Sequence, residues 1–254
     1  MGIQVRDLPA FHVAYMRYVG PYGAHGIPAL WRRLRTWMEP RGLCTRDRAR
    51  RRHAGPLPER PLPAREAPVS RDRAELAYYA SQGPITDPGP QARALAGLPG
   101  DLRGLTRVVQ GLVFHYFADE GIFGWRPPPE RIAEIDTRHA SAMLARLAAL
   151  DARPLTEPRP PERRLVGCCR DFTVLLCTLA RAQGIPVRAR VGFARYFSPD
   201  FHVDHEIVEW WDAGQHRWRL ADPELSERHL DHYRIGFDPF DVPRDQFLVG
   251  GGAW

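Results

Sequence analysis

The segment GCCRDFTVLLCTLARAQGIP, residues 167–186, decides the fold that we predict for this chain. After its second cysteine, apolar side chains recur at the spacing of one buried helix face: Phe172, Leu175, Leu176, Leu179 and Ala180. Gly184, followed by Pro186, is a strong helix stop signal. The two cysteines therefore lie at the amino-terminal end of a core helix. Since the helix macrodipole favours an anion there, we expect a lowered thiol pKa and a nucleophilic thiolate.

Strands are expected after this helix. Residues 187–193 alternate apolar and polar side chains as a half-buried strand does, and residues 205–211 and 216–222 are two further candidate strands separated by a DAGQ turn. Upstream, residues 105–117 and 130–150 have the spacing of amphipathic helices. These patterns together predict an α+β fold in which the helix that bears the nucleophile packs on an antiparallel sheet.

A catalytic thiol needs a base, and the base needs an acid that orients it. If the turn between the last two strands is centred on Ala213 and Gly214, His205 lies directly opposite Asp222, with Cβ atoms about 4.5–5.5 Å apart. A carboxylate beside an imidazole holds one tautomer and stabilises the imidazolium. The inference depends on register, because a slip of one residue would put the two side chains on opposite faces. The predicted catalytic residues are Cys169, His205 and Asp222.

Three stretches resemble the transglutaminase-like superfamily, whose members share a papain-like Cys-His-Asp core: GCCRDFTVLLCTLARAQGIPVRARVGF, DHEIVEWWD and RWRLADPEL. The resemblance covers about residues 76–254 and implies a papain/transglutaminase-like core. The pattern is similar to that of an uncharacterised bacterial branch with the motif G-N-C-R-D-F. This resemblance implies that Cys169 is the nucleophile and that Cys168 stands where asparagine is usual.

The resemblance implies a thiol-dependent amide or ester hydrolase or acyltransferase, peptidase- or transglutaminase-like, that acts on a peptide, amide or ester through a thioester intermediate. The backbone N–H of Cys169 is expected to donate to the developing oxyanion. Gln110 and His115, on the predicted helix 105–117, are candidates for the second donor. The acyl group then passes to water or to an amine.

Three segments differ in composition. Residues 1–44 are predicted to form a strand and a helix, and residues 5–43 resemble the start of a GyrI-like effector-binding domain, of which they would be a fragment. Residues 45–75 hold nine Arg and five Pro without apolar periodicity, which predicts a disordered linker. Residues 76–254 form the expected transglutaminase-like domain. Its carboxyl-terminal end, FLVGGGAW, comes earlier than the resemblance suggests, so truncation is expected.

Composition limits the remaining classes of function. All 36 basic residues are Arg, and residues 76–254 hold 21 Arg against 23 acidic residues. The basic excess thus lies upstream of the motifs, and we expect no nucleic-acid partner. The sequence contains no run of about 18 apolar residues, so we predict no membrane span. Because the four cysteines lack disulfide-like spacing and the amino terminus lacks an apolar signal stretch, we expect reduced thiols in the cytoplasm.

The sequence also allows interpretations other than a catalytic one. In HVDH, residues 202–205, the two histidines would not share a face of a strand, so we expect neither a metal site nor a cofactor. Two alternatives stay open. In the first, the domain is a non-catalytic binding module with a decayed triad; Glu206 favours this alternative, because the similar branch commonly has Trp at that position. In the second, residues 1–44 make the chain a small-molecule-sensing regulator.

Overall fold

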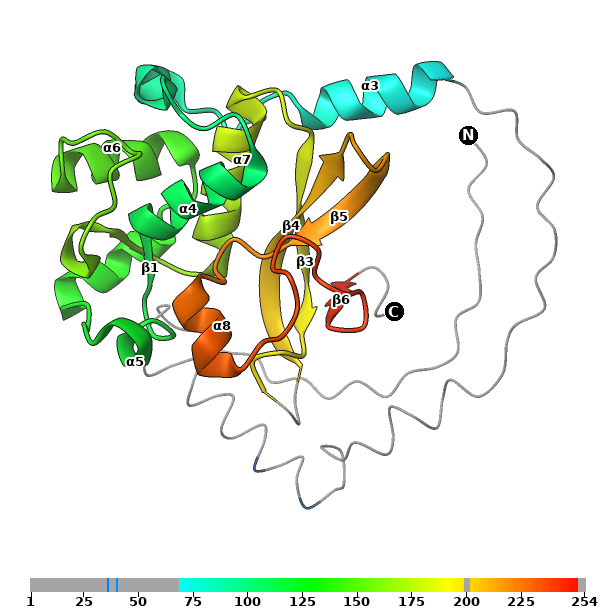
Figure 1. Ribbon diagram of the computed structural model, residues 1–254. Coiled ribbons are helices and arrows are strands. Elements are labelled where there is room, and N and C mark those ends of the chain that lie inside the picture. Colours follow the sequence, from blue (N-terminus) through cyan, green and yellow to red (C-terminus); the bar gives the residue numbers. More distant parts are fainter. Residues whose placement is uncertain (1–35, 37–39, 41–68, 199–201, 251–254) are drawn as a thin grey trace.

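The computed structural model describes residues 36, 40, 69–198 and 202–250, and Figure 1 shows their arrangement. The strand and helix predicted for residues 1–44 lie outside the described residues, apart from the two isolated positions. Helix α3 (Val69–Tyr79) begins within the predicted linker, so the expected boundary at residue 76 falls inside a helix. Its sequence VSRDRAELAYY contains Ala, Arg, Glu and Leu, which are good helix formers, and this local propensity outweighs the Arg-rich composition of the segment.

A four-stranded antiparallel sheet forms one layer of the described chain. Its strand order is β5 (Arg217–Ala221), β4 (Val203–Asp212), β3 (Val187–Ala194) and β6 (Phe247–Val249). Helix α7 (Cys169–Ala182) packs against β3 and β4. The fold predicted from the sequence, a helix packed on an antiparallel sheet, is therefore confirmed.

Helices α4 (Leu102–Leu112) and α6 (Ala140–Leu150) pack on the other side of α7, and Figure 1 shows them on the side away from the sheet. The short strands β1 (Val113–His115) and β2 (Leu165–Gly167) pair in parallel, and β2 leads directly to the start of α7. None of the helices in the described part of the chain is long and apolar enough to cross a membrane.

Both predicted upstream helices are shorter than expected. The helix expected over residues 105–117 ends at Leu112, because the following Val-Phe-His segment pairs with β2 as a strand and these β-branched and aromatic residues favour strand backbone. The pattern over residues 130–150 is divided between α6 and a 3₁₀ helix, η3 (Pro129–Asp136). The remaining elements are α5 (Glu120–Phe123), η2 (Gly89–Leu95), η4 (Pro161–Arg163) and α8 (Glu227–Tyr233).

Helix α7 is the centre of the largest hydrophobic cluster. All of its residues from Asp171 to Ala180 are buried, including the apolar positions that the sequence pattern identified. The sequence predicted one buried stripe, whereas helices on one side and the sheet on the other bury the helix almost all round. A helix fixed on both sides holds its first residues, the cysteine pair, at a defined point in the molecule.

Candidate functional site

The cysteine pair lies where β2 passes into α7. Cys168 is the N-cap, with an extended backbone, and Cys169 is the first helical residue. The Asp171 carboxylate reaches back and accepts a hydrogen bond from the Cys168 N–H, with an N–Oδ2 distance of 2.8 Å. Arg170 pairs with Asp171 at 2.8 Å and also donates to the carbonyl of Ile135. These contacts satisfy a helix-end donor and fix the backbone that carries the two thiols.

Gly167, at the end of β2, makes this helix start sterically possible. A Cβ atom there would lie 2.8 Å from Asp171 Oδ2, 2.9 Å from Asp171 Cβ and 3.1 Å from Val113 Cγ1. Any larger residue would therefore push against the carboxylate that caps α7. Glycine is required here because neighbouring atoms approach closely. A left-handed backbone is not the reason, since Gly167 does not have a positive φ.

His205 and Asp222 meet on the sheet. The His205 ring lies on β4, and Asp222 follows the last residue of β5; His205 Nε2 and Asp222 Oδ2 are 2.8 Å apart. Both residues are buried, His205 being 5% exposed and Asp222 1% exposed. A buried imidazole that uses Nε2 for the carboxylate has Nδ1 left for another partner.

The predicted register of this hairpin is wrong by two residues. Asp212 pairs with Arg217 and Val208 pairs with Ala221, so Asp222 does not lie directly opposite His205. The loop between the strands is centred between Gly214 and Gln215, one position later than expected. Because side chains alternate with a period of two, a shift of two residues keeps both side chains on one face, and they meet diagonally.

Several groups besides His205 hold the Asp222 carboxylate. The Tyr196 hydroxyl donates to Oδ2 at 2.6 Å, and the backbone N–H of Glu224 donates to Oδ1 at 3.0 Å. Burial raises the pKa of Asp222, but the histidine and these two donors outweigh it and keep the pKa below its ordinary value. Asp222 is therefore an ionised, fully hydrogen-bonded acceptor for the imidazole. Sequence reasoning missed Tyr196 because nothing along the chain links it to the motif.

Cys169 faces the strand that carries His205. The backbone N–H of Glu206, the residue after His205, hydrogen-bonds the Cys169 sulfur, and the Glu206 carbonyl accepts from Thr173 Oγ1 on α7 at 3.0 Å. The first turn of α7 is thus attached to β4 beside the imidazole. An edge-on ring of Phe197, with its centroid 4.9 Å from that of His205, covers part of the same region.

The pKa of the Cys169 thiol departs from the sequence expectation. The hydrogen bond with the Cys168 thiol, burial, and the negative charge of Glu224 raise this pKa well above its ordinary value, and the Glu206 N–H lowers it only in part. The expectation of a lowered pKa considered the helix dipole alone. A second thiol in contact and a buried carboxylate nearby act in the opposite direction. The resting thiol is consequently protonated.

The other cysteines and histidines of the motifs have different settings. Cys177 lies on the buried side of α7, where burial raises its pKa to about 12. His115 lies in β1 opposite Gly167, and burial lowers its pKa to about 4. Gln110 lines a groove of about 540 Å³ between α4 and α8, so it belongs to a different surface.

A cluster of side chains that could bind a metal ion lies away from residues 202–205, where the sequence analysis considered a metal site. In the described residues, Asp119, Glu224 and His229 bring one ligand atom each to within 4.8 Å of one another. His202 and His205 belong to no such group among those residues. The sequence offered little signal for the cluster, because its members are 105 and 5 positions apart along the chain.

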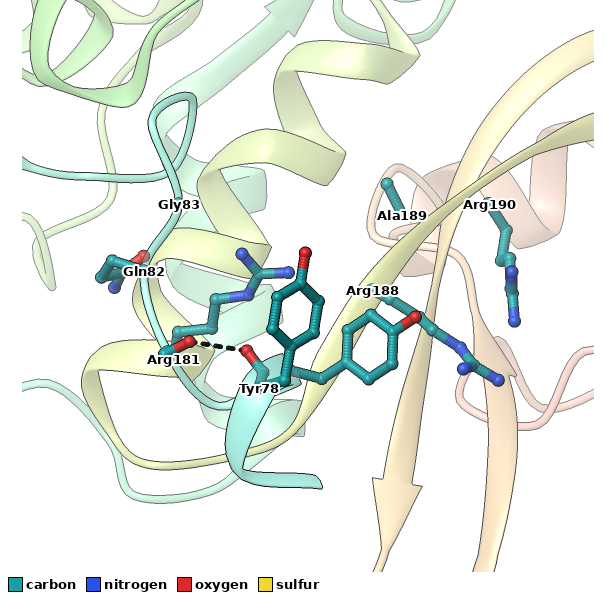
Figure 2. A pocket seen from close by; sticks show the side chains of 9 residues that line it. Tyr78, Gln82, Gly83, Arg181, Arg188, Ala189 and Arg190 are labelled. Atoms are coloured by element: carbon teal, nitrogen blue, oxygen red, sulfur yellow. Dashed lines mark hydrogen bonds between the residues drawn. The ribbon is translucent and has the colours of Figure 1, made fainter. Parts of the chain in front are cut away.

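A further cavity lies at the opposite end of α7 from the cysteines. Figure 2 shows Tyr78, Arg181 and Arg188 among the residues around this hollow, which has a volume of about 290 Å³. Arg181 is 12 residues after Cys169, and a rise of about 1.5 Å per helical residue separates them by about 18 Å along the axis. This cavity is therefore separate from the cysteine and histidine groups.

One family model matches part of the chain. Residues 160–223 match the transglutaminase-like superfamily, and this range contains the cysteine pair, His205 and Asp222. Among solved structures, the chain is similar to a proposed cysteine protease from Cytophaga hutchinsonii, with 15% identity and a TM-score of 0.39. The similarity covers 62% of this chain and 45% of that one, so it extends over less than half of that protein. No curated protein matches the chain.

Proposed function

We propose that this chain, whose residues 160–223 match the transglutaminase-like superfamily, is a thiol-dependent amide or ester hydrolase or acyltransferase in which Cys169 is the nucleophile, His205 the base and Asp222 the orienting acid. The observation that carries the proposal is the buried hydrogen bond between His205 and Asp222. His205 lies on β4, the same strand whose Glu206 N–H contacts the Cys169 sulfur. The substrate is a peptide, an amide or an ester.

Catalysis starts from a neutral thiol, because the pKa of Cys169 is raised. As the sulfur attacks the substrate carbonyl, His205 Nδ1 accepts the thiol proton while Nε2 stays bonded to Asp222. The new S–C bond pushes the carbonyl π electrons onto oxygen. When the intermediate collapses, the leaving amine or alkoxide takes the proton from the imidazolium and a thioester remains. Water or an amine then attacks the thioester with His205 again acting as the base.

Stabilisation of the oxyanion is assigned to two donors. The backbone N–H of Cys169, at the first position of α7, is the first. His115 is the second, since its ring Nδ1 accepts from the Ala118 N–H at 3.3 Å, which puts the ring proton on Nε2. With a pKa of about 4, this imidazole is neutral at physiological pH and donates without adding a charge. Gln110 is not needed in this assignment.

Acylation by a p-nitrophenyl ester tests the proposal. The wild-type protein should release p-nitrophenolate, and mass spectrometry should find the acyl group on Cys169. Cys169→Ala should lose the acyl adduct, whereas Cys168→Ala is the matched control that keeps it. Asp222→Asn should slow acylation by a factor on the order of 10²–10⁴, as removal of an orienting carboxylate does in serine proteases. An acyl group on Cys168 alone, or equal acylation of Asp222→Asn and the wild type, would rule out the assigned roles.

One observation favours a second candidate, a non-catalytic binding module. A neutral thiol beside a second cysteine is a weak nucleophile unless the histidine deprotonates it during the reaction. In such a module, Cys169 would react no faster than an unfolded thiol, and His205→Gln would leave its alkylation rate unchanged. In the proposed enzyme, the rate with iodoacetamide at pH 7 falls in His205→Gln.

A further inference from the structure

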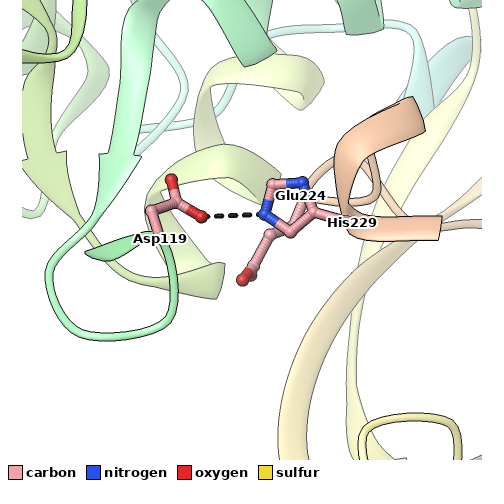
Figure 3. A group of neighbouring side chains, drawn as sticks. All are labelled: Asp119, Glu224 and His229. Carbon is pink, nitrogen blue, oxygen red and sulfur yellow. Dashed lines mark hydrogen bonds and ion pairs between the residues drawn. The ribbon is translucent and has the colours of Figure 1, made fainter. Parts of the chain in front are cut away.

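Asp119, Glu224 and His229 form a buried cluster beneath the cysteine site. They come from three separate parts of the fold: Asp119 is the N-cap of α5, Glu224 lies in the connection after β5, and His229 is on α8. Their exposed fractions are 1%, 3% and 2%. Figure 3 shows the Asp119 carboxylate facing the imidazole, with the Glu224 carboxylate close to both. The proposed hydrolase mechanism uses none of the three side chains.

In Asp119 and His229, the side-chain atom that faces away from the cluster already has a hydrogen-bond partner. Asp119 Oδ2 accepts from the backbone N–H of His115 at 2.8 Å, so Oδ1 is the atom that faces the cluster. His229 Nδ1 lies 2.6 Å from Ser226 Oγ, so Nε2 is the atom that faces the cluster, 2.8 Å from Asp119 Oδ1. A metal-binding histidine commonly uses one ring nitrogen for the metal and bonds an oxygen with the other.

Glu224 supplies the independent evidence for a ligand. Its Oε2 atom is buried and has no hydrogen-bond partner among the described residues. A carboxylate oxygen buried without a partner is costly, and such groups in folded proteins are paired or coordinate a metal. Burial, together with the negative charges of Asp222 and Asp119, raises the pKa of Glu224 well above its ordinary value, so a metal ion would bind here in exchange for the Glu224 proton.

We propose that Asp119 Oδ1, a carboxylate oxygen of Glu224 and His229 Nε2 bind one divalent transition-metal ion of the zinc or manganese class. Two carboxylates with one imidazole suit these ions, whereas calcium prefers oxygen ligands alone. Ligand atoms within 4.8 Å of one another close on an ion with bonds of about 2.0–2.2 Å after a small movement, and the ion takes the place of the hydrogen bond between Asp119 and His229.

The ion would join α5 and α8 to the strand end that holds Asp222. The Glu224 N–H donates to Asp222 at 3.0 Å, so a bound Glu224 side chain also restrains the orienting carboxylate. This site is opposite to the sequence expectation of no metal. The inference is independent of the proposed hydrolase reaction, because it needs only the three ligands.

Cobalt(II) is the probe, since it replaces zinc and reports its ligands by absorption. Metal-free, chelator-treated wild-type protein should bind one equivalent of Co²⁺ and gain visible d–d bands without the near-ultraviolet band of sulfur-to-cobalt charge transfer. Glu224→Gln, which keeps the side-chain shape, should bind Co²⁺ at least about tenfold more weakly, because loss of even an outer-shell contact costs about 10–100-fold. His229→Gln is a second variant with the same expected loss.

Two controls separate this site from the thiols and from misfolding. The Cys168→Ser/Cys169→Ala variant should keep its affinity for Co²⁺, because the site contains no sulfur. Urea unfolding of metal-free Glu224→Gln should match metal-free wild type, because glutamine keeps the side-chain shape and, like a carboxyl group whose pKa burial raises, carries no charge. Absence of Co²⁺ binding to the wild type, equal affinity in Glu224→Gln, or loss of binding in the thiol variant would each overturn the proposal.

Discussion

Replacing Gly167 with alanine should destabilise the protein through the start of α7. The new Cβ would meet Asp171 Oδ2 at 2.8 Å and Val113 Cγ1 at 3.1 Å, both closer than side-chain carbons normally approach. Because the obstructing atoms include a strand-buried Val and a carboxylate that is itself hydrogen-bonded, relief requires Asp171 to move away from the Cys168 N–H.

The magnitude follows from two contributions. Forcing one methyl group into a well-packed site costs about 1–3 kcal/mol of unfolding free energy. Loss of a helix cap costs about 1 kcal/mol more. We therefore expect Gly167→Ala to lower the free energy of unfolding by about 2–4 kcal/mol, and to slow acylation of Cys169 because the helix start that carries the thiol shifts.

Urea denaturation followed by tryptophan fluorescence measures this loss. Gly100→Ala is the matched control, because a Cβ atom at Gly100 meets no atom within 4 Å and its backbone φ is not left-handed. Both variants reduce the conformational freedom of the unfolded chain equally, so their difference isolates the clash. If Gly167→Ala is as stable as Gly100→Ala to within about 0.5 kcal/mol, the steric argument for glycine at this position is refuted.

Three further outcomes are expected. Burial raises the pKa of Glu209, but hydrogen bonds from three arginines outweigh it and keep that pKa below the ordinary value of 4.5. A carboxylate with a depressed pKa stabilises the fold above pH 4.5 and loses this contribution as the pH falls through the folded-state pKa. The difference in urea-unfolding free energy between pH 7 and pH 3 should therefore be smaller in Glu209→Gln than in the wild type. An unchanged difference would contradict the ion-pair argument. Tyr196→Phe removes the 2.6 Å hydrogen bond to Asp222 and should cost about 1.5–3 kcal/mol by the same assay, and a loss below about 0.5 kcal/mol would show that this bond contributes little. Cys177, which is 2% exposed and has a pKa of about 12, should resist iodoacetamide at pH 8 in the folded protein and react after urea unfolding, whereas alkylation in the folded protein would show that the α7 core opens.

Local pattern was sufficient for the central elements. The apolar spacing after Cys169 and the Gly184 stop signal predicted α7, which the structure ends at Ala182. Alternation predicted the strand at β3, and two further candidate strands were predicted where β4 and β5 lie. These features depend on residues within a few positions of one another, so the helix and strand periods are visible in the sequence itself. For the same reason, face alternation kept His205 and Asp222 on one side although the predicted hairpin register was wrong by two residues.

What the sequence alone determined was therefore the order of helix and strands and the residue types at their ends. Tertiary structure alone decided which distant groups surround them: Tyr196 on Asp222, Glu206 on the Cys169 sulfur, and Asp119 beside His229. Burial and neighbouring charges set a pKa, and both arise from packing between segments far apart along the chain. The thiol at a helix start, expected to be acidic from its position alone, has a raised pKa for that physical reason.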